Sequence, residues 1–142
     1  MLQLLLALLL AGWGSGGAAA PSQPTLQEAG RAFSVHWSAG DAGALGGMMS
    51  AAGVRLNLEG GGHASVGVRQ AVAALRDLHD LHRPGSTRLT RVSDAGGDPP
   101  RGFAELQWRT VTGAGEPRTF SLFVGFVQEG GAWRVSEIRV LR

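Results

Sequence analysis

The stretch that decides the fold is the end of the chain, residues 131–142, which reads GAWRVSEIRVLR. Apolar and charged side chains alternate along it, which is typical of a strand with one face toward a core. The apolar positions change from odd to even numbers, in the order Trp133, Val135, Ile138 and Val140. A regular strand cannot place both sets on one face. We therefore expect the closing strand of a sheet, with a β-bulge near Ser136 and Glu137 and with Arg134 and Arg142 in solvent.

Three further strands are expected before this one, because the spacing of apolar residues changes to a period of two in the second half of the chain. The first lies near residues 87–93. The second, residues 103–111, places four side chains on one face, namely Ala104, Leu106, Trp108 and Thr110. The third, residues 118–127, is apolar on both faces and is therefore expected at the centre of the sheet. Glu129 and the two glycines after it predict a hairpin turn into the last strand.

Helical patterns open the first half of the chain. Thr25 and Glu28 have the spacing of a capping box, which predicts a helix over residues 26–38. The face that this helix turns to the core carries Leu26, Gly30, Phe33 and Trp37. Asp41 is expected to cap a second, shorter helix that extends to Met49.

An early strand and a third helix follow. Residues 54–59 alternate strictly and predict a half-buried strand whose inner face carries Val54, Leu56 and Leu58. Ser65 is expected to cap the third helix, which extends to about His82 and has an apolar stripe of Val68, Ala71, Val72, Leu75 and Leu78. The order of helix, helix, strand, helix and four antiparallel strands indicates an α+β domain, with one curved sheet wrapped on a long helix.

This order and its local segments resemble the nuclear transport factor 2-like superfamily, the cone-shaped, cystatin-like α+β roll shared with ketosteroid isomerase and polyketide cyclases. The resembling segments are HWSAGDAGALGGMM, VRLNLEG, the third helix with QAVAALRDL, and GFVQEGGAWRVSEIRVL. Within the superfamily the chain is most similar to small exported bacterial domains of unknown function, and the resemblance covers residues 26–142. It implies a conical pocket between sheet and helices and, in many members, a homodimer through the outer sheet face. It does not imply one activity.

The composition excludes several classes of function. A length of 142 residues fits one domain, and the absence of Cys excludes disulfides, thiolate metal ligands and thiol nucleophiles. The 13 basic side chains are all Arg, stand against 11 acidic ones and form no basic run. We therefore expect no nucleic-acid partner. The segment HDLH, residues 79–82, has the spacing of half a metal site but lacks a third ligand, so we expect no metal and no cofactor.

The first 20 residues have the pattern of a signal peptide. An apolar run over residues 2–11 is too short to span a bilayer, and small residues follow it up to Ala20. An uncleaved leader that anchors the domain in a membrane is the alternative. In either case we expect an exported domain, periplasmic or extracellular, with a linker over residues 21–25 and the folded domain over residues 26–142.

The best-known chemistry of the resembled fold is missing its groups. The ketosteroid isomerase pattern needs a carboxylate base and an oxyanion hole built from Tyr and a protonated Asp. This chain has no Tyr, and where many members have an acid after the second helix it reads MMSAAGV. An acid–base pair is still conceivable for His63 or His79 with Glu59 or Asp80. The plainer interpretations are a loop residue for His63, a histidine at the core edge for His79, and a helix-end charge for His82.

The aromatic residues are the more informative set. Trp37, Trp108, Trp133 and either Phe120 or Phe123 should approach one another where the first helix meets the sheet. They either line an apolar pocket or fill it as a core. The residues expected around a ligand are Phe33, Trp37, Leu56, Val72, His79, Trp108, Phe120, Phe123 and Trp133.

The sequence therefore predicts an exported, non-catalytic domain. It would bind a small apolar ligand in the cone, or a protein partner through the cone or the outer sheet face, where Glu105, Gln107 and Arg109 lie. A second copy of the chain is one such partner. An isomerase, lyase or hydrolase that uses a His–carboxylate pair is the alternative.

Overall fold

The computed structural model describes residues 24–59 and 64–142, which form one α+β domain. A single sheet carries every strand, and its strands lie in the order β2-β1-β6-β5-β4-β3. The elements in chain order are α1 (Leu26–Ser38), α2 (Ala42–Gly47), β1 (Val54–Asn57), β2 (Ala64–Val66), α3 (Val68–Leu81), β3 (His82–Gly96), β4 (Arg101–Thr112), β5 (Pro117–Glu129) and β6 (Ala132–Leu141).

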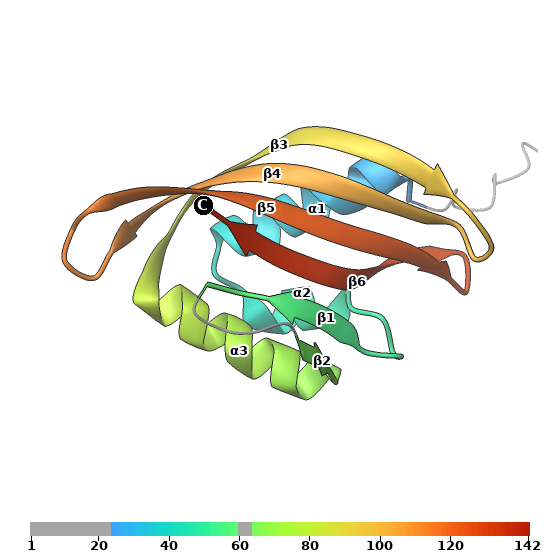
Figure 1. Ribbon diagram of the computed structural model, residues 1–142, viewed down its shortest axis with the longest axis horizontal. Helices are drawn as coiled ribbons and strands as arrows, with labels where there is room; N and C mark the ends of the chain where they lie inside the picture. The colour runs from blue at the N-terminus through green and yellow to red at the C-terminus, as the bar shows by residue number, and fades with distance from the viewer. Residues whose placement is uncertain (1–23, 60–63) are drawn as a thin grey trace, which may run out of the picture.

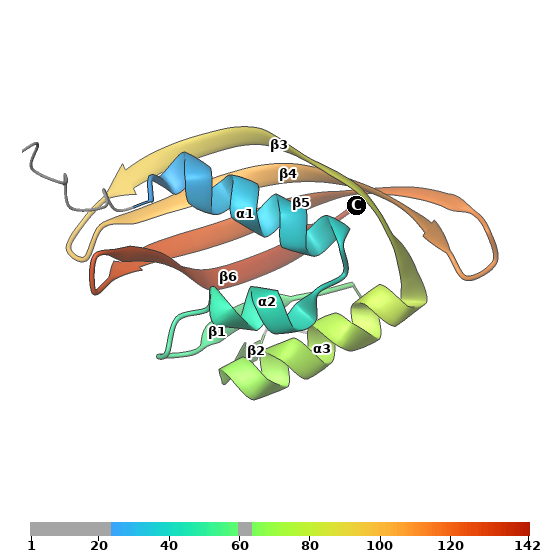
Figure 2. The same cartoon turned by 180° about the vertical axis from the view of Figure 1, so that it is seen from behind.

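The sheet is strongly curved and the helices lie on its concave side, with α1 across β3, β4 and β5 and with α2 and α3 beside β1 (Figures 1 and 2). The four long strands pair antiparallel, as expected. The early strand β1 joins the same sheet by pairing parallel to β6, and β2 extends the sheet beyond it. The sheet is therefore mixed, and the concave face and the helices enclose a cone.

Both predicted helix caps are present. Thr25 accepts a hydrogen bond from the Glu28 backbone N–H at 3.1 Å, while the Glu28 carboxylate accepts one from the Thr25 backbone N–H, so the capping box is complete. The Asp41 side chain caps α2 by accepting from the Ala44 backbone N–H at 3.0 Å. This helix ends at Gly47 rather than at Met49, because two consecutive glycines close it.

The boundaries around the third helix differ from those expected. Ser65 lies in the short strand β2, and α3 starts from Gly67 with no side-chain cap. The helix ends at Leu81, so that His82 is already the first residue of β3. The strand predicted over residues 54–59 ends at Asn57, and the one predicted over residues 87–93 is much longer, from His82 to Gly96.

The predicted bulge in β6 is confirmed. Gly125 of β5 pairs with Glu137, and the next residue, Phe126, pairs with Val135, so that Ser136 has no partner across the strand. The extra residue moves the inner face of β6 from odd to even numbers, and Val135, Ile138 and Val140 are all buried. The hairpin before β6 is also as predicted, with positive φ angles of 56° and 78° at Gly130 and Gly131.

β3 passes very close to β4 where it leaves the helix. A Cβ atom at Gly85 would lie 1.8 Å from the carbonyl oxygen of Arg109, so only glycine fits there. The Thr110 hydroxyl donates to the carbonyl oxygen of Arg83 beside this point, and the register shifts between Arg83 and Ser86. The close approach at Gly85 and this hydrogen bond hold the start of β3 against β4, next to His82, whose ring contacts Trp108 and Phe120.

The core is the space between α1 and the concave face. Residues of even number from Ala104 to Thr110 on β4 and from Phe120 to Phe126 on β5 are buried, which confirms the predicted inner face of β4. No helix in the described residues is both long and apolar enough to cross a membrane.

Candidate ligand site in the cone

Four aromatic rings form the centre of the cone. Trp37 on α1 is stacked on Phe33 with ring centroids 5.5 Å apart and meets Trp108 of β4 edge-on at 5.3 Å. Trp108 in turn is stacked on Phe120 of β5 at 5.1 Å. All four side chains are at most 1% exposed. The rings therefore fill the described interior as a close-packed cluster that joins the first helix to the sheet.

His79 on α3 enters this cluster. Its ring lies edge-on to Trp37 with centroids 4.8 Å apart and to Trp108 at 6.0 Å. Neither ring nitrogen has a hydrogen-bond partner among the described residues. Burial lowers the pKa of His79 below its ordinary value, an effect that the nearby Asp80 carboxylate opposes, and His82 lowers it further. His79 is therefore a neutral imidazole at pH 7, with one donor and one acceptor inside an apolar surrounding.

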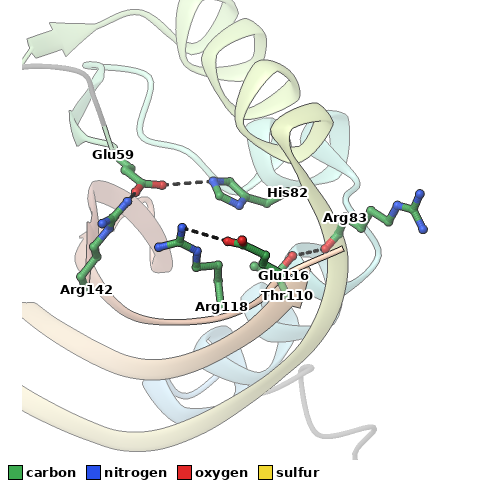
Figure 3. A network of polar contacts seen from close by, with 7 residues as sticks. All are labelled: Glu59, His82, Arg83, Thr110, Glu116, Arg118 and Arg142. Atoms are coloured by element: carbon green, nitrogen blue, oxygen red, sulfur yellow. Dashed lines mark hydrogen bonds and ion pairs between the residues drawn. The ribbon is translucent and has the colours of Figure 1, made fainter. Parts of the chain in front are cut away.

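His82 and Glu59 form an acid–base pair at the mouth of the cone (Figure 3). The Nε2 atom of His82 lies 3.1 Å from Oε2 of Glu59. Arg142, the last residue, donates from Nε to Oε1 of the same carboxylate at 2.8 Å. The hydrogen bond from Arg142 lowers the pKa of Glu59, against the effect of its partial burial, and His82 lowers it further. The carboxylate is therefore a weak base at neutral pH, which suits it to orient His82.

The ring of His82 is part of the same aromatic assembly. It lies edge-on to Trp108, with centroids 5.7 Å apart, and to Phe120 at 5.1 Å. Its Nδ1 atom is buried without a described partner. His82 thus connects the polar mouth, where Glu59 and Arg142 meet, to the rings inside. Figure 3 also shows the more exposed pair of Glu116 and Arg118, from the hairpin between β4 and β5.

Unsatisfied ring nitrogens are the chemical signature of this site. Within the described residues, five buried nitrogen atoms of the cone lack a partner, namely Trp37 Nε1, Trp108 Nε1, His79 Nδ1, His79 Nε2 and His82 Nδ1. Each buried polar group without a partner costs about 1–3 kcal/mol. An indole nitrogen can only donate, so the two tryptophans require an acceptor that the described protein atoms do not supply. Because the rings fill this interior, an acceptor oxygen would reach either indole only if a ring moved aside.

The predicted ligand residues divide into two groups. Leu56, Phe33, Trp37, Trp108 and Phe120 are buried in the core, together with His79, and Val72 is packed against it. Trp133 is half-buried beside the core. Phe123 has the opposite orientation from Phe120: it is stacked on Phe103 at 5.1 Å, and Phe103 lies on the outer face of the sheet. Of the two phenylalanines proposed for the cone, only Phe120 lies in it.

Among the predicted acid–base residues that the structure describes, Glu59, His79 and Asp80 form no hydrogen-bonded pair of a histidine with a carboxylate. Glu59 pairs with His82, which the sequence assigned to a helix-end role, and Asp80 is exposed on α3. His63 lies outside the described residues, as do the leader and residues 21–23 of the linker. No group of three metal-ligating side chains occurs in residues 24–59 and 64–142. His82 stands directly between a helix and a long polar strand. This position is the one signal in the sequence from which its location at the mouth of the cone could have been predicted.

Comparisons with known proteins identify the fold. No family model and no curated protein sequence matches the chain. Among solved structures, a DUF4783 family protein from Bacteroides uniformis aligns with 16% sequence identity and a TM-score of 0.66, over 79% of this chain and 94% of that one. A ketosteroid isomerase-like protein from Erwinia carotovora aligns with 15% identity and a TM-score of 0.65, over 81% and 91% of the two chains.

A third similar structure is a protein of ketosteroid isomerase-like fold from Catenulispora acidiphila, in complex with trimethylamine. It aligns with 17% identity and a TM-score of 0.64, over 83% of this chain and 87% of that one. Together with the curved sheet and its helices, these likenesses show that the chain has the nuclear transport factor 2-like fold. They concern the fold alone, since the identities are low, and function must be argued from the site.

Proposed function

We propose that the chain is an exported, non-catalytic binding domain that takes a small ligand into the cone, and that this ligand has an apolar body and one hydrogen-bond acceptor. The observation that supports this is the pair of buried indole N–H groups, on Trp37 and Trp108, without an acceptor. A carbonyl oxygen, or a carboxylate oxygen that both indoles and His79 solvate, would give these N–H groups the acceptor that they lack. The surrounding rings would pack against the apolar body.

The mouth of the cone supports a ligand of this kind. Arg142 and His82 both lie there beside Glu59, so a ligand that enters passes donors on one side and rings on the other. Burial keeps the His79 imidazole neutral, and its N–H can donate without a net charge inside the cone. Because the rings are closely packed, the ligand is small or displaces Trp37 or His79 as it binds.

The test uses the indole N–H signals of the ¹⁵N-labelled protein, assigned with single Trp→Phe variants. Hexanoate, cyclohexanone and cyclohexane are added as probes of similar size with a carboxylate, a carbonyl or no acceptor. The expected result is that the first or second probe shifts the signals of Trp37 and Trp108 and leaves Trp133 unchanged, while cyclohexane has a smaller effect. If no probe moves these signals and Trp37→Phe raises the stability, the indole groups are an unfilled packing defect and the proposal is wrong.

The alternative function, acid–base catalysis, is favoured by one observation, the 3.1 Å contact between His82 and Glu59. It is tested with cyclohexanone in deuterated water, because a general base in the cone would accelerate hydrogen exchange next to the carbonyl. We expect no acceleration over buffer for the protein or for its His82→Gln variant. Exchange that the wild-type protein accelerates and the variant does not would replace the binding function by an enzymatic one.

The export part of the proposal rests on the apolar run over residues 2–11 and the small residues that follow it. Cell fractionation with N-terminal sequencing of the mature chain tests it. We expect a chain outside the cytoplasm that begins between residues 19 and 21. A cytoplasmic chain that still carries its first residues would contradict export and leave the cone proposal unaffected.

A further inference from the structure

The outer face of the sheet carries a second set of features, which the cone site does not use. The strand register arranges its side chains in rows that run across the strands. One row consists of Arg139, Phe123, Glu105 and Arg91, and the next row consists of Leu141, Ser121, Gln107 and Arg88. The first of these rows forms a ridge, because Phe123 is stacked on Phe103. The second lies lower, since Ser121 and Gln107 stand at its centre.

A groove follows the lower row. It has a volume of about 320 Å³, with Phe123 and Leu141 at one end, Ser121 and Gln107 along the floor and Arg88 at the other end. A second hollow of about 260 Å³, which Arg109 lines, shares Arg88 and Gln107 with the first. The two form one trough that is apolar at one end and basic at the other. Leu141 is 44% exposed at the apolar end.

The outer face carries more basic than acidic charge: Arg88 and Arg109 line the trough, Arg91 lies on the ridge beside it, and Glu105 is the one carboxylate among the described lining residues. Arg88, Arg91 and Arg109 form no ion pair with any described residue, whereas Arg139 is paired with Glu137. Glu105 is the only carboxylate in the two rows described above, and Glu137 beside them is already paired with Arg139. With three unpaired guanidinium groups against one such carboxylate, the face attracts an anionic partner.

The aromatic ridge indicates what kind of anion fits. Phe103 and Phe123 cover each other, Arg91 lies over Phe103 at 5.6 Å, and Arg139 lies over Phe123 at 5.4 Å. Each ring thus packs against the other ring and against one guanidinium, which leaves less ring surface for a sugar to stack on than a bare aromatic platform would offer. Arg88 and Arg109, in the trough beside the rings, are exposed and form no ion pair with a described residue, so their planar guanidinium groups can form bidentate hydrogen bonds with a carboxylate. This favours a carboxylate-bearing protein segment over an acidic polysaccharide.

The same charges oppose a second copy of the chain. A two-fold interface places the same patch of both subunits face to face. Here it would bring Arg88, Arg91 and Arg109 of each copy toward the same residues of the other, with Glu105 as the one unpaired counter-charge. Such a contact places like charges together in a region from which water is removed, which is unfavourable.

We propose that the outer trough binds an acidic segment of a partner protein, with an apolar side chain between Phe123 and Leu141 and carboxylates on Arg88 and Arg109. This proposal adds a second binding surface to the binding function proposed above, and that surface lies on the opposite side of the sheet from the cone. It does not depend on a cone ligand, because the two sets of side chains point to opposite faces.

The experiment measures the binding of fluorescein-labelled peptides by anisotropy. The first probe is a short peptide of glutamates interrupted by leucines, the second contains glutamates alone, and the third has glutamines in place of the glutamates. The expected order of affinity is first, second, third, and the binding should weaken as salt is added. Failure of the third probe to bind more weakly than the first would overturn the role of charge. Equal affinity of the first two would overturn the apolar anchor.

Two double variants of equal net charge locate the site. Arg88→Gln/Arg109→Gln removes the basic end of the trough, whereas Arg31→Gln/Arg76→Gln removes exposed charges from α1 and α3. We expect the trough variant to bind the first peptide about tenfold more weakly and the helix variant to bind it as the wild-type protein does. All four arginines are exposed, and thermal unfolding of both variants checks that the fold is intact.

Three results would overturn the proposal. An equal loss of affinity in both variants would show that net charge alone attracts the peptide. Retention on heparin that the trough variant abolishes, without peptide binding, would assign the face to an anionic polysaccharide. A concentration-dependent dimer of the wild-type protein that the trough variant dissociates, as measured by sedimentation, would assign the face to a second copy. None of these results bears on the indole signals that test the cone ligand.

Discussion

On β4 and β5 the side chains of even number form the floor of the cone, and those of odd number form the outer face of the same sheet. From Ala104 to Thr110 and from Phe120 to Phe126 every even residue is buried. The odd residues between them are half-buried or exposed, and they include Arg109, Phe123 and Glu105. Both faces contain stacked aromatic pairs, Trp108 with Phe120 inside and Phe103 with Phe123 outside.

The difference lies in what surrounds each pair. Inside, the rings meet other rings and the imidazoles of His79 and His82, so they contribute mainly through the burial of apolar surface and leave their N–H groups unsatisfied. Outside, the rings meet guanidinium groups and leave a trough beside them. The inner pair should therefore determine stability, and the outer pair should determine the shape of a surface.

The strongest test removes one aromatic ring from each face. We expect Trp108→Ala to lower the free energy of unfolding by about 3–5 kcal/mol, because it empties the centre of a fully buried cluster. Phe123→Ala should lower it by about 1–2 kcal/mol, since this ring is half-buried and packs against only Phe103 and the Arg139 guanidinium on the outer face. Denaturation in urea measures both. If Trp108→Ala does not fold, Trp108→Phe serves instead, and an equal effect at the two positions would end the distinction between the faces.

A methyl group added to each face tests the packing more finely. The Cβ atom of Gly102→Ala would point into the cone, 2.4 Å from a methyl carbon of Leu26 and 3.1 Å from the Ser93 carbonyl oxygen. We expect a loss of about 1–3 kcal/mol. Gly125→Ala adds its Cβ on the outer face, 3.2 Å from the Cβ of Glu137. The two strands need to separate there by only a few tenths of an ångström, so the loss should stay below about 1 kcal/mol. A larger loss at Gly125 than at Gly102 would mean that the outer face is the more tightly packed one.

Much of the inner face could be predicted from the sequence, because local patterns determine it. The capping box of Thr25 and Glu28, the alternation of β4, and the phase change that produced the bulge at Ser136 are all visible within a few residues. The choice between Phe120 and Phe123 could also have been made. The even positions of β5 from Phe120 to Phe126 are all apolar, whereas Phe123 shares its parity with Thr119 and Ser121.

The rest depends on register between distant segments. The parallel pairing of β1 with β6 joins segments about 80 residues apart, and no local pattern specifies it. The length of β3 was missed because its Arg, Thr and Ser residues face solvent and give no apolar period. In the same way, the pair of Glu59 and His82 and the ridge of Arg91, Phe103, Phe123 and Arg139 arise only when strands and helix are assembled.

The pH dependence of stability tests the inner face alone, because the two groups with shifted pKa values, His79 and Glu59, lie in the cone or at its mouth. Burial lowers the pKa of His79 in the folded protein below its ordinary value of 6.5, so the unfolded chain binds a proton first as the pH falls. Stability is therefore present above pH 6.5 and is lost as the pH falls toward the lower, folded value. His82 and Asp80 lie near this group, and Glu59 adds its own loss only below its ordinary value of 4.5, because its pKa is also lowered.

The variant His79→Gln should flatten this loss as the pH falls below about 6.5, whereas His36→Gln, at a half-exposed position of α1, should keep it. Urea midpoints at several pH values measure the slope for each protein. Because the slopes are compared, a general destabilisation by either substitution does not affect the result. An unchanged slope in His79→Gln would assign the acid sensitivity to other groups and show that His79 is not held neutral by the cone.

The smallest change in the free energy of unfolding is expected on the outer face, where Arg91 lies over an aromatic ring and Arg88 lines the trough without contacting a ring. Arg91→Gln removes a guanidinium from the face of Phe103 and should lower the free energy of unfolding by about 0.5–1 kcal/mol. Arg88→Gln removes one that contacts no ring and should change it by less than about 0.5 kcal/mol. Urea denaturation of the two variants under the same conditions measures the difference. A stability cost at Arg88 as large as that at Arg91 would mean that Arg88 supports the fold. A negligible cost leaves a charge that stabilises nothing within the described protein, as expected of a residue that acts on a partner.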